Sequence, residues 1–302
     1  MMTTRLKGLV AAPYTPFGAD GHVNTGIIEE YAEYLGLMGI TGVFVCGTTG
    51  EWPALTVSER KAILEEWIRC AKGSLTIIAH VGSNDISMSM DLARHAYESG
   101  ADATGMIAPS FFKPSTPSEL LSCLQPVAAE SAPLPFYYYH IPSITGVNFA
   151  VSDLLKSVHN VIPNFAGVKY THSDLYDMQK CLAFENGRYQ VMHGFDEILL
   201  CGVTLGVEAA VGSTYNYMPS VYLEMIDAFS KGDMDVARER QLFSVKIVSL
   251  LNKYGGSTVA GKAIMKFIGL DCGPNRLPLQ TLKGERLEAF RKDLADAGFF
   301  RI

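Results

Sequence analysis

Phe165-Ala-Gly-Val-Lys-Tyr-Thr171 has the pattern of a short buried strand with a lysine inside it. A nearly continuous apolar run of this length is typical of a parallel sheet that is covered on both faces. Successive side chains of a strand alternate between the two faces. The stretch therefore predicts Lys169 and Thr171 on one face of the sheet and Val168 and Tyr170 on the other.

The lysine in this strand suggests a specific chemistry. Lysine is rarely buried because its ammonium loses hydration in an apolar environment. Burial disfavours the charged form, so the pKa falls and the neutral amine becomes a nucleophile that can form a Schiff base. The alternative is a lysine at a strand end that extends to solvent or pairs with a carboxylate.

Similar strand-like segments recur on both sides of this one, each followed by a helical pattern. They are 9–15, 42–46, 76–81, 103–109, 135–141, 165–171, 189–193 and 208–212. Eight strands that alternate with helices predict an α/β protein with a closed TIM (β/α)8 barrel. A doubly wound open sheet is the alternative, but no GxGxxG motif follows the first strand.

The last quarter of the chain has helical patterns only, over 233–252, 258–268 and 284–297. We therefore expect a catalytic barrel over 1–231 and a helical extension, packed on the barrel, over 232–302. Helix ends can also be read from the sequence. Thr56-Val-Ser-Glu59 has the form of a capping box and predicts the start of a helix.

Composition restricts the class of protein. The 302 residues are 48% hydrophobic and 19% charged, as expected for a globular chain with a large core. A net charge of −6 without a basic block argues against nucleic acid as a partner.

No apolar run approaches the roughly 18 residues that a membrane span requires. The N-terminal residues lack a signal peptide pattern, so a cytoplasmic location is expected. The six cysteines have no metal-binding spacing and are expected to be buried thiols.

In a barrel of this kind the functional site lies where the strands end. Polar groups with useful chemistry follow several of these ends. Gly47-Thr-Thr-Gly-Glu51 offers backbone amides and the hydroxyls of Thr48 and Thr49 as a cradle for a carboxylate. Tyr139, near the end of the fifth strand, has a phenol that could transfer protons. Acids and hydroxyls at the ends of the last two strands could bind a polyhydroxylated substrate: Asp196, Glu197 and Ser213.

Four histidines suggest a competing chemistry. His80, His140, His172 and His193 all fall near strand ends, where they could hold zinc. None has HxH or HxxxH spacing, and the alternation of strand side chains points His140 away from the face of Tyr139 and His193 away from that of Gly194. We therefore expect no metal site.

Three separated motifs, in order along the chain, resemble those of one known family. They are Gly47–Glu51, Tyr139-His-Ile-Pro-Ser-Ile-Thr-Gly146 and the strand that holds Lys169. On these motifs the chain is similar, over roughly residues 5–300, to the pyruvate-dependent class I aldolases that include dihydrodipicolinate synthase and N-acetylneuraminate lyase. The resemblance is strongest to the lyase branch, through Ala79–Gly82, Gly194–Glu197 and Val211–Tyr217.

The resemblance implies a function for each of these sites. Lys169 would form a Schiff base with a keto acid and Tyr139 would transfer protons, while Thr48 and Thr49 would hold the carboxylate. The sugar chain would be bound by Thr171, Gly194, Asp196, Glu197 and Ser213. The reaction would be the reversible cleavage of N-acetylneuraminate, a sialic acid, to N-acetylmannosamine and pyruvate. No metal or organic cofactor is implied, and family members are usually homotetramers.

Two departures argue against a synthase. Ile144 stands where the synthase has an arginine that binds its substrate's carboxylate, and Phe111 replaces a tyrosine that relays protons. Phenylalanine has no transferable proton. Other readings stay open: an aldolase for another sugar acid such as 2-keto-3-deoxygluconate, a dihydrodipicolinate synthase-like enzyme, or a ligand-binding regulator that has kept the barrel.

Overall fold

A computed structural model describes residues 5–301 of the chain. Residues 1–4 and 302 lie outside the described part. The outer ends of the predicted ranges 1–231 and 232–302 therefore fall outside it, as does part of the N-terminal stretch that lacks a signal peptide pattern.

Eight parallel strands form a closed barrel in chain order, with β1 paired to both β2 and β8. Their bounds are β1 Gly8–Ala11, β2 Gly42–Val45, β3 Thr76–His80, β4 Ala103–Ile107, β5 Phe136–His140, β6 Phe165–Tyr170, β7 Gln190–His193 and β8 Ala209–Gly212. The predicted strands and the predicted barrel are confirmed, although most strands are shorter than their apolar runs. In β1 the ladder stops before Pro13, which has no amide proton to donate.

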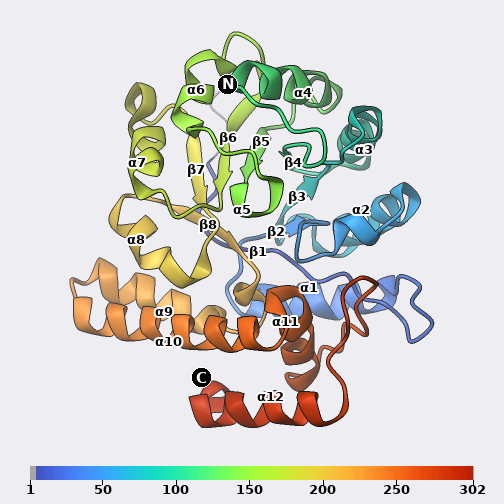
Figure 1. Cartoon of the computed structure of the whole chain (residues 1–302), viewed down its shortest axis with the longest axis vertical. Helices are drawn as coiled ribbons and strands as arrows, with labels where there is room; N and C mark the ends of the chain where they lie inside the picture. Colours follow the sequence, from blue (N-terminus) through green and yellow to red (C-terminus); the bar gives the residue numbers. More distant parts are fainter. Residues whose placement is uncertain (1–4, 302) are drawn as a thin grey trace.

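Helices surround the barrel and follow the strands along the chain (Figure 1). Their bounds are α1 Ile28–Leu37, α2 Val57–Ala71, α3 Ile86–Ser99, α4 Pro117–Glu130, α5 Pro142–Thr145, α6 Val151–Val158, α7 Leu175–Ala183, α8 Leu199–Thr204 and α9 Pro219–Ser230. The predicted capping box is present at α2, where Thr56 accepts from the Glu59 amide and Glu59 accepts from the Thr56 amide.

The core has two layers, as expected when strand side chains alternate between two faces. Side chains that point into the barrel form one layer, which includes Phe44, Tyr137 and Tyr139. Side chains that point outward pack under the helices in the other layer, which includes Val168 and Tyr170. Lys169 lies between two outward residues of β6 and therefore points inward, as the alternation predicts.

A helical extension follows α9, as predicted. It consists of α10 Met234–Lys253, α11 Gly256–Phe267 and α12 Gly284–Ala297. Helix α10 packs against α9, and α11 and α12 pack against α10. In Figure 1 these helices lie together on one side of the barrel.

Two features differ from the expectations. The short helix α5 was not expected, because four residues that begin with a proline carry no helical periodicity. The prediction that all six cysteines are buried was wrong: Cys46, Cys181 and Cys272 are buried, Cys70 and Cys123 are intermediate and Cys201 is exposed. Among residues 5–301, none of the helices is long and apolar enough to cross a membrane.

Candidate active site

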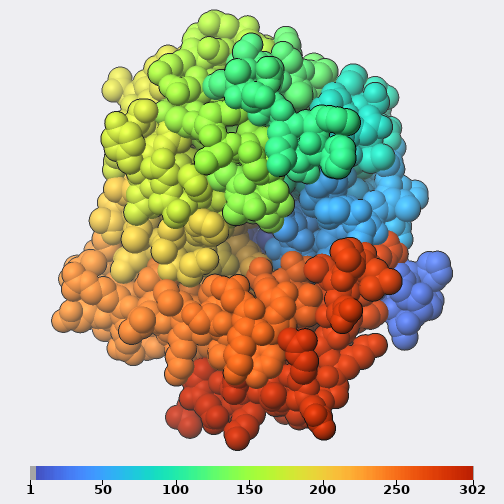
Figure 2. Space-filling model, in the orientation of Figure 1, coloured from blue at the N-terminus to red at the C-terminus, as the bar shows by residue number. Residues whose placement is uncertain are grey.

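A cavity of about 230 Å³ opens at the mouth of the barrel where the strands end. Figure 2 shows a hollow there, bordered by green and yellow segments of the barrel and by the orange C-terminal helices. The structure brings together all of the site residues predicted from the sequence. The cavity is lined by Thr48, Thr49, Tyr139, Lys169, Thr171, Gly194, Asp196, Glu197 and Ser213.

Lys169 is 4% exposed and sits among aromatic groups. Its Nζ lies 3.9 Å from the centre of the Tyr139 ring and 4.3 Å from that of Phe44. Burial lowers the pKa of the Lys169 amine to about 7, although the charge of Asp196 opposes this shift. A large fraction of the amine is therefore neutral and nucleophilic near neutral pH.

Tyr139 is the neighbour of Lys169 on the adjacent strand. The two residues are in register across β5 and β6, so their side chains point to the same face. Burial raises the pKa of the Tyr139 phenol, which outweighs the opposing effect of the Thr48 and Thr171 hydroxyls. Its oxygen lies 3.4 Å from Thr48 Oγ1. The phenol thus keeps its proton beside the lysine and can pass it on.

The loop after β2 lines the same cavity through Thr48 and Thr49, with the Thr48 hydroxyl next to the Tyr139 phenol. Within residues 5–301, neither of these two backbone amides donates to a protein acceptor. Thr49 is 8% exposed. Two free amides and two hydroxyls beside a buried lysine form a suitable cradle for a carboxylate.

Asp196 lies deep in the cavity, at 5% exposed. Its Oδ2 accepts from the amide and the hydroxyl of Thr214, at 2.9 and 2.6 Å. Its Oδ1 has no partner among the described residues. Burial raises the pKa of both Asp196 and Glu197. One firmly held acid with a free oxygen, next to a second acid, can recognise substrate hydroxyls.

Two glycines allow this close packing at the ends of β7 and β8. A Cβ at Gly194 would lie 1.9 Å from Thr171 Oγ1, and a Cβ at Gly212 would lie 1.9 Å from Asp196 Oδ1. Both distances are far shorter than any real contact. The Gly194 that the resemblance implies therefore has a physical role, because it gives Thr171 room to reach the cavity.

The sequence analysis missed some of the lining residues. Ser143 belongs to the unexpected helix α5. Asn252 and Ser257 come from the extension, far from any strand end. A strand-end search has no signal for these two residues, since only the packing of α10 and α11 over the mouth brings them there.

The four histidines do not converge. His80 points into the barrel, with its ring centre 6.2 Å from that of Tyr139. His140 and His172 pair with each other, 5.6 Å apart, on the outer side of the strands. His193 packs against Gly202 of α8. Across residues 5–301, no three His, Cys, Asp or Glu side chains are grouped in a way that could hold a metal ion.

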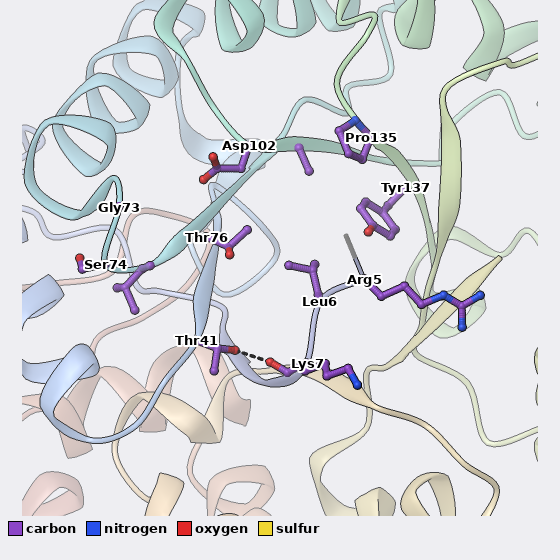
Figure 3. A pocket seen from close by; sticks show the side chains of 12 residues that line it. Arg5, Leu6, Lys7, Thr41, Gly73, Ser74, Thr76, Asp102, Pro135 and Tyr137 are labelled. Carbon is purple, nitrogen blue, oxygen red and sulfur yellow. Dashed lines mark hydrogen bonds between the residues drawn. The ribbon is translucent and has the colours of Figure 1, made fainter. Parts of the chain in front are cut away.

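A larger hollow, of about 460 Å³, lies at the opposite mouth of the barrel. Figure 3 shows Arg5, Lys7, Asp102 and Tyr137 around it, with the Thr41 hydroxyl donating to the Lys7 carbonyl. These groups are at the starts of the strands. In this architecture residues at the strand starts usually serve stability, and active sites lie at the strand ends. The smaller cavity around Lys169 is therefore the candidate active site.

A family model described as the dihydrodipicolinate synthetase family matches residues 5–297. The chain belongs to this family. The N-acetylneuraminate lyase of Gallus gallus is 43% identical over 279 residues, which cover 91% of both chains. Among solved structures, the N-acetylneuraminate lyase of Proteus mirabilis is 38% identical and matches with a TM-score of 0.95, covering 98% of this chain and 100% of that one. The lyase of Aliivibrio salmonicida has the same identity and TM-score and covers 98% of both chains.

The two positions that differ from the synthases have distinct surroundings. Ile144, on α5, is 54% exposed and lines the cavity, so this wall lacks a cation for a second carboxylate. Phe111 is 77% exposed in the segment after β4, with its ring against Phe112. This member of the dihydrodipicolinate synthetase family therefore lacks both the arginine and the tyrosine that the resemblance associates with the synthase reaction.

Proposed function

We propose that this enzyme is an N-acetylneuraminate lyase, which cleaves N-acetylneuraminate reversibly to N-acetylmannosamine and pyruvate. The observation that carries the proposal is the buried Lys169, whose pKa is lowered to about 7, in register with the Tyr139 phenol at the base of one cavity. The similarity to lyases from animals and bacteria supports the same substrate.

The reaction begins at the keto group of the open-chain sugar acid. Thr48 and Thr49 bind the carboxylate, which orients C2 toward Lys169. The neutral amine attacks C2 to form a carbinolamine, which takes up one proton from solvent and loses water to give a protonated Schiff base. This iminium withdraws electrons from the neighbouring C3–C4 bond.

Cleavage needs a proton to move as that bond breaks. The Tyr139 phenol accepts the proton of the C4 hydroxyl while its own proton passes to the substrate carboxylate. The electrons of the C3–C4 bond move into the iminium and form an enamine, and N-acetylmannosamine leaves as the aldehyde. Tyr139 then passes the proton that it took from the C4 hydroxyl to C3 of the enamine and regains its own from the carboxylate. Hydrolysis of the Schiff base by water releases pyruvate and the free lysine.

The remaining predicted residues would bind the sugar chain. Asp196 offers a free Oδ1, and Glu197, Ser213 and Thr171 line the same cavity. A site that pairs several buried polar groups with substrate hydroxyls rejects analogues that lack them, because those groups would then be left without partners.

We further propose that the enzyme needs no metal or organic cofactor, because the iminium on Lys169 is itself the electron sink. We also propose that the protein is a homotetramer in the cytoplasm. Each chain would consist of a catalytic barrel over 1–231 and a helical extension over 232–302. Light scattering of the purified protein tests the oligomeric state, and activity after dialysis against EDTA tests the independence from metals.

Turnover of N-acetylneuraminate is the direct test. We expect pyruvate and N-acetylmannosamine in equal amounts, with and without EDTA, and no turnover by Lys169→Met. Faster cleavage of 2-keto-3-deoxygluconate than of N-acetylneuraminate would identify a different sugar-acid aldolase. Binding of pyruvate without turnover of either compound would identify a ligand-binding regulator instead.

A further inference from the structure

Glu51, the last residue of the loop that carries Thr48 and Thr49, is buried away from the cavity. It is 3% exposed and has a left-handed backbone, with φ of 58°. Non-glycine residues seldom adopt this conformation, so surrounding contacts have to hold it. The Glu51 amide donates to the Thr48 carbonyl at 3.1 Å, which links its position directly to Thr48.

The contacts that hold the Glu51 carboxylate come from the C-terminal extension. Oε1 accepts from Lys262 Nζ at 2.8 Å and from Asn275 Nδ2 at 3.0 Å. Oε2 accepts from the Arg276 amide at 2.9 Å. These donors are more than 200 residues away along the chain, on α11 and on the segment that follows it.

Lys262 is equally well held. Both side chains of the ion pair are 1% exposed. Lys262 Nζ also donates to the Pro274 carbonyl at 2.8 Å and lies 4.2 Å from the centre of the Phe17 ring. A buried pair with such complete hydrogen bonding has one defined geometry, and removal of either partner leaves an uncompensated charge.

We propose that Glu51 and Lys262 are a pair of positioning residues that fix the carboxylate-binding loop to the C-terminal extension. In this role the extension does more than cover the mouth: it sets the distance between the Thr48 and Thr49 amides and Lys169, and therefore the affinity for the keto acid. The inference rests on the proposed function, because it assumes that Thr48 and Thr49 bind a substrate carboxylate.

A purely structural ion pair would behave differently. Its loss would weaken every ligand of Lys169 alike through general loosening of the barrel. Loss of a positioning pair weakens only ligands that carry a carboxylate. Pyruvate and acetone make this distinction, because both form a Schiff base through a keto group and acetone has no carboxylate.

The first variant is Glu51→Gln. The amide has one acceptor oxygen where the carboxylate has two, and its NH2 group faces an N–H donor of the extension. Borohydride trapping on Lys169 measures Schiff base formation with each ligand. We expect the trapping efficiency with pyruvate to fall about tenfold, which corresponds to the loss of one charged hydrogen bond between the loop and the pyruvate carboxylate. The trapping efficiency with acetone should stay within about twofold of the original.

Two further variants separate position from stability. Glu51→Gln combined with Lys262→Met removes both charges, which often restores the stability that a single substitution loses. We expect the melting temperature to recover in this double variant while trapping with pyruvate stays low. Glu224→Gln is the matched control, because it weakens the ion pair of Glu224 on α9 with Arg240 on α10, another link between barrel and extension, at residues that do not contact Glu51 or Lys262. It should leave the ratio of pyruvate to acetone trapping unchanged.

The outcomes keep the two proposals apart. Equal losses for pyruvate and acetone in Glu51→Gln, or recovery of pyruvate trapping together with the melting temperature in the double variant, would overturn the positioning role alone. The unaltered protein is trapped in parallel. If it gave no pyruvate adduct on Lys169, the proposed function would fail, and the positioning role would fail with it.

Discussion

Within residues 5–301 two lysines are buried, and their surroundings give them different chemistry. Lys262 is 2% exposed and donates to a carboxylate and a carbonyl, so its ammonium form is fully satisfied. Lys169 is 4% exposed, and its amine lies over two aromatic rings. Burial lowers the pKa of both lysines, and at Lys262 the hydrogen-bonded Glu51 carboxylate opposes this shift. Among the described residues Lys169 has no such direct partner, and it lines the cavity; this difference makes it the nucleophile.

The lowered pKa of Lys169 predicts how adduct formation depends on pH. Below pH 7 the amine is mainly protonated and cannot attack; above it the amine is mainly neutral. The initial rate of borohydride trapping at low pyruvate should therefore rise with pH to a plateau, with a midpoint near the pKa of about 7. A midpoint near the ordinary lysine value, roughly 10.4, would show that the site does not activate the amine.

Tyr139 is predicted to act in proton transfer and not in forming the adduct. Tyr139→Phe keeps the ring over Lys169 and removes the only transferable proton. Turnover of N-acetylneuraminate should fall about 10²–10⁴-fold, the usual contribution of a positioned acid or base, while a pyruvate adduct still forms. A variant that lost turnover and adduct formation in equal measure would instead point to a role in placing the lysine.

At the scale of elements, the ends of β6 and β7 meet at Gly194. A Cβ there would lie 1.9 Å from Thr171 Oγ1 and 3.0 Å from the Thr171 backbone. Gly194→Ala should therefore force the strand ends apart, cost about 1–3 kcal/mol in urea unfolding and lower turnover. Gly36→Ala, on an open position of α1, is the control and should be neutral or slightly stabilising. Equal stability of the two variants would contradict this packing.

The strands could be predicted from the sequence because each one is a short apolar run between helical patterns. The site residues could be predicted because they lie near the end of a strand or just after it. Helix α5 could not, since four residues carry no periodicity. Nor could the partnership of Glu51 with Lys262, because a loop glutamate and a helix lysine 211 positions apart give no local signal. Contacts of this kind depend on how the extension packs, which local patterns do not contain.

At the scale of the whole molecule, the buried amine should reduce stability. Between pH 7 and 10.5 the folded chain holds fewer protons at Lys169 than the unfolded chain, so stability rises with pH across this window. The loss of stability caused by burial of the Lys169 amine is fully present below pH 7 and disappears toward pH 10.5. Lys169→Met should therefore raise the free energy of unfolding by a few kcal/mol at pH 6, and by less at pH 9.

Urea unfolding of both proteins at the two pH values measures this difference, and subtraction removes the titration of all other groups. A variant that is less stable than the original at pH 6 would mean that the lysine contributes to the fold. The expected result, a more stable but inactive protein, is the usual relation between a functional site and the stability of its scaffold.

The most direct single measurement is borohydride trapping with pyruvate, read by intact-protein and peptide mass spectrometry in the presence and absence of EDTA. We predict one pyruvate adduct per chain, on the peptide that contains Lys169 and insensitive to EDTA. An adduct on Lys262 or another lysine, or no adduct at all, would contradict the assignment of Lys169 as the Schiff-base nucleophile.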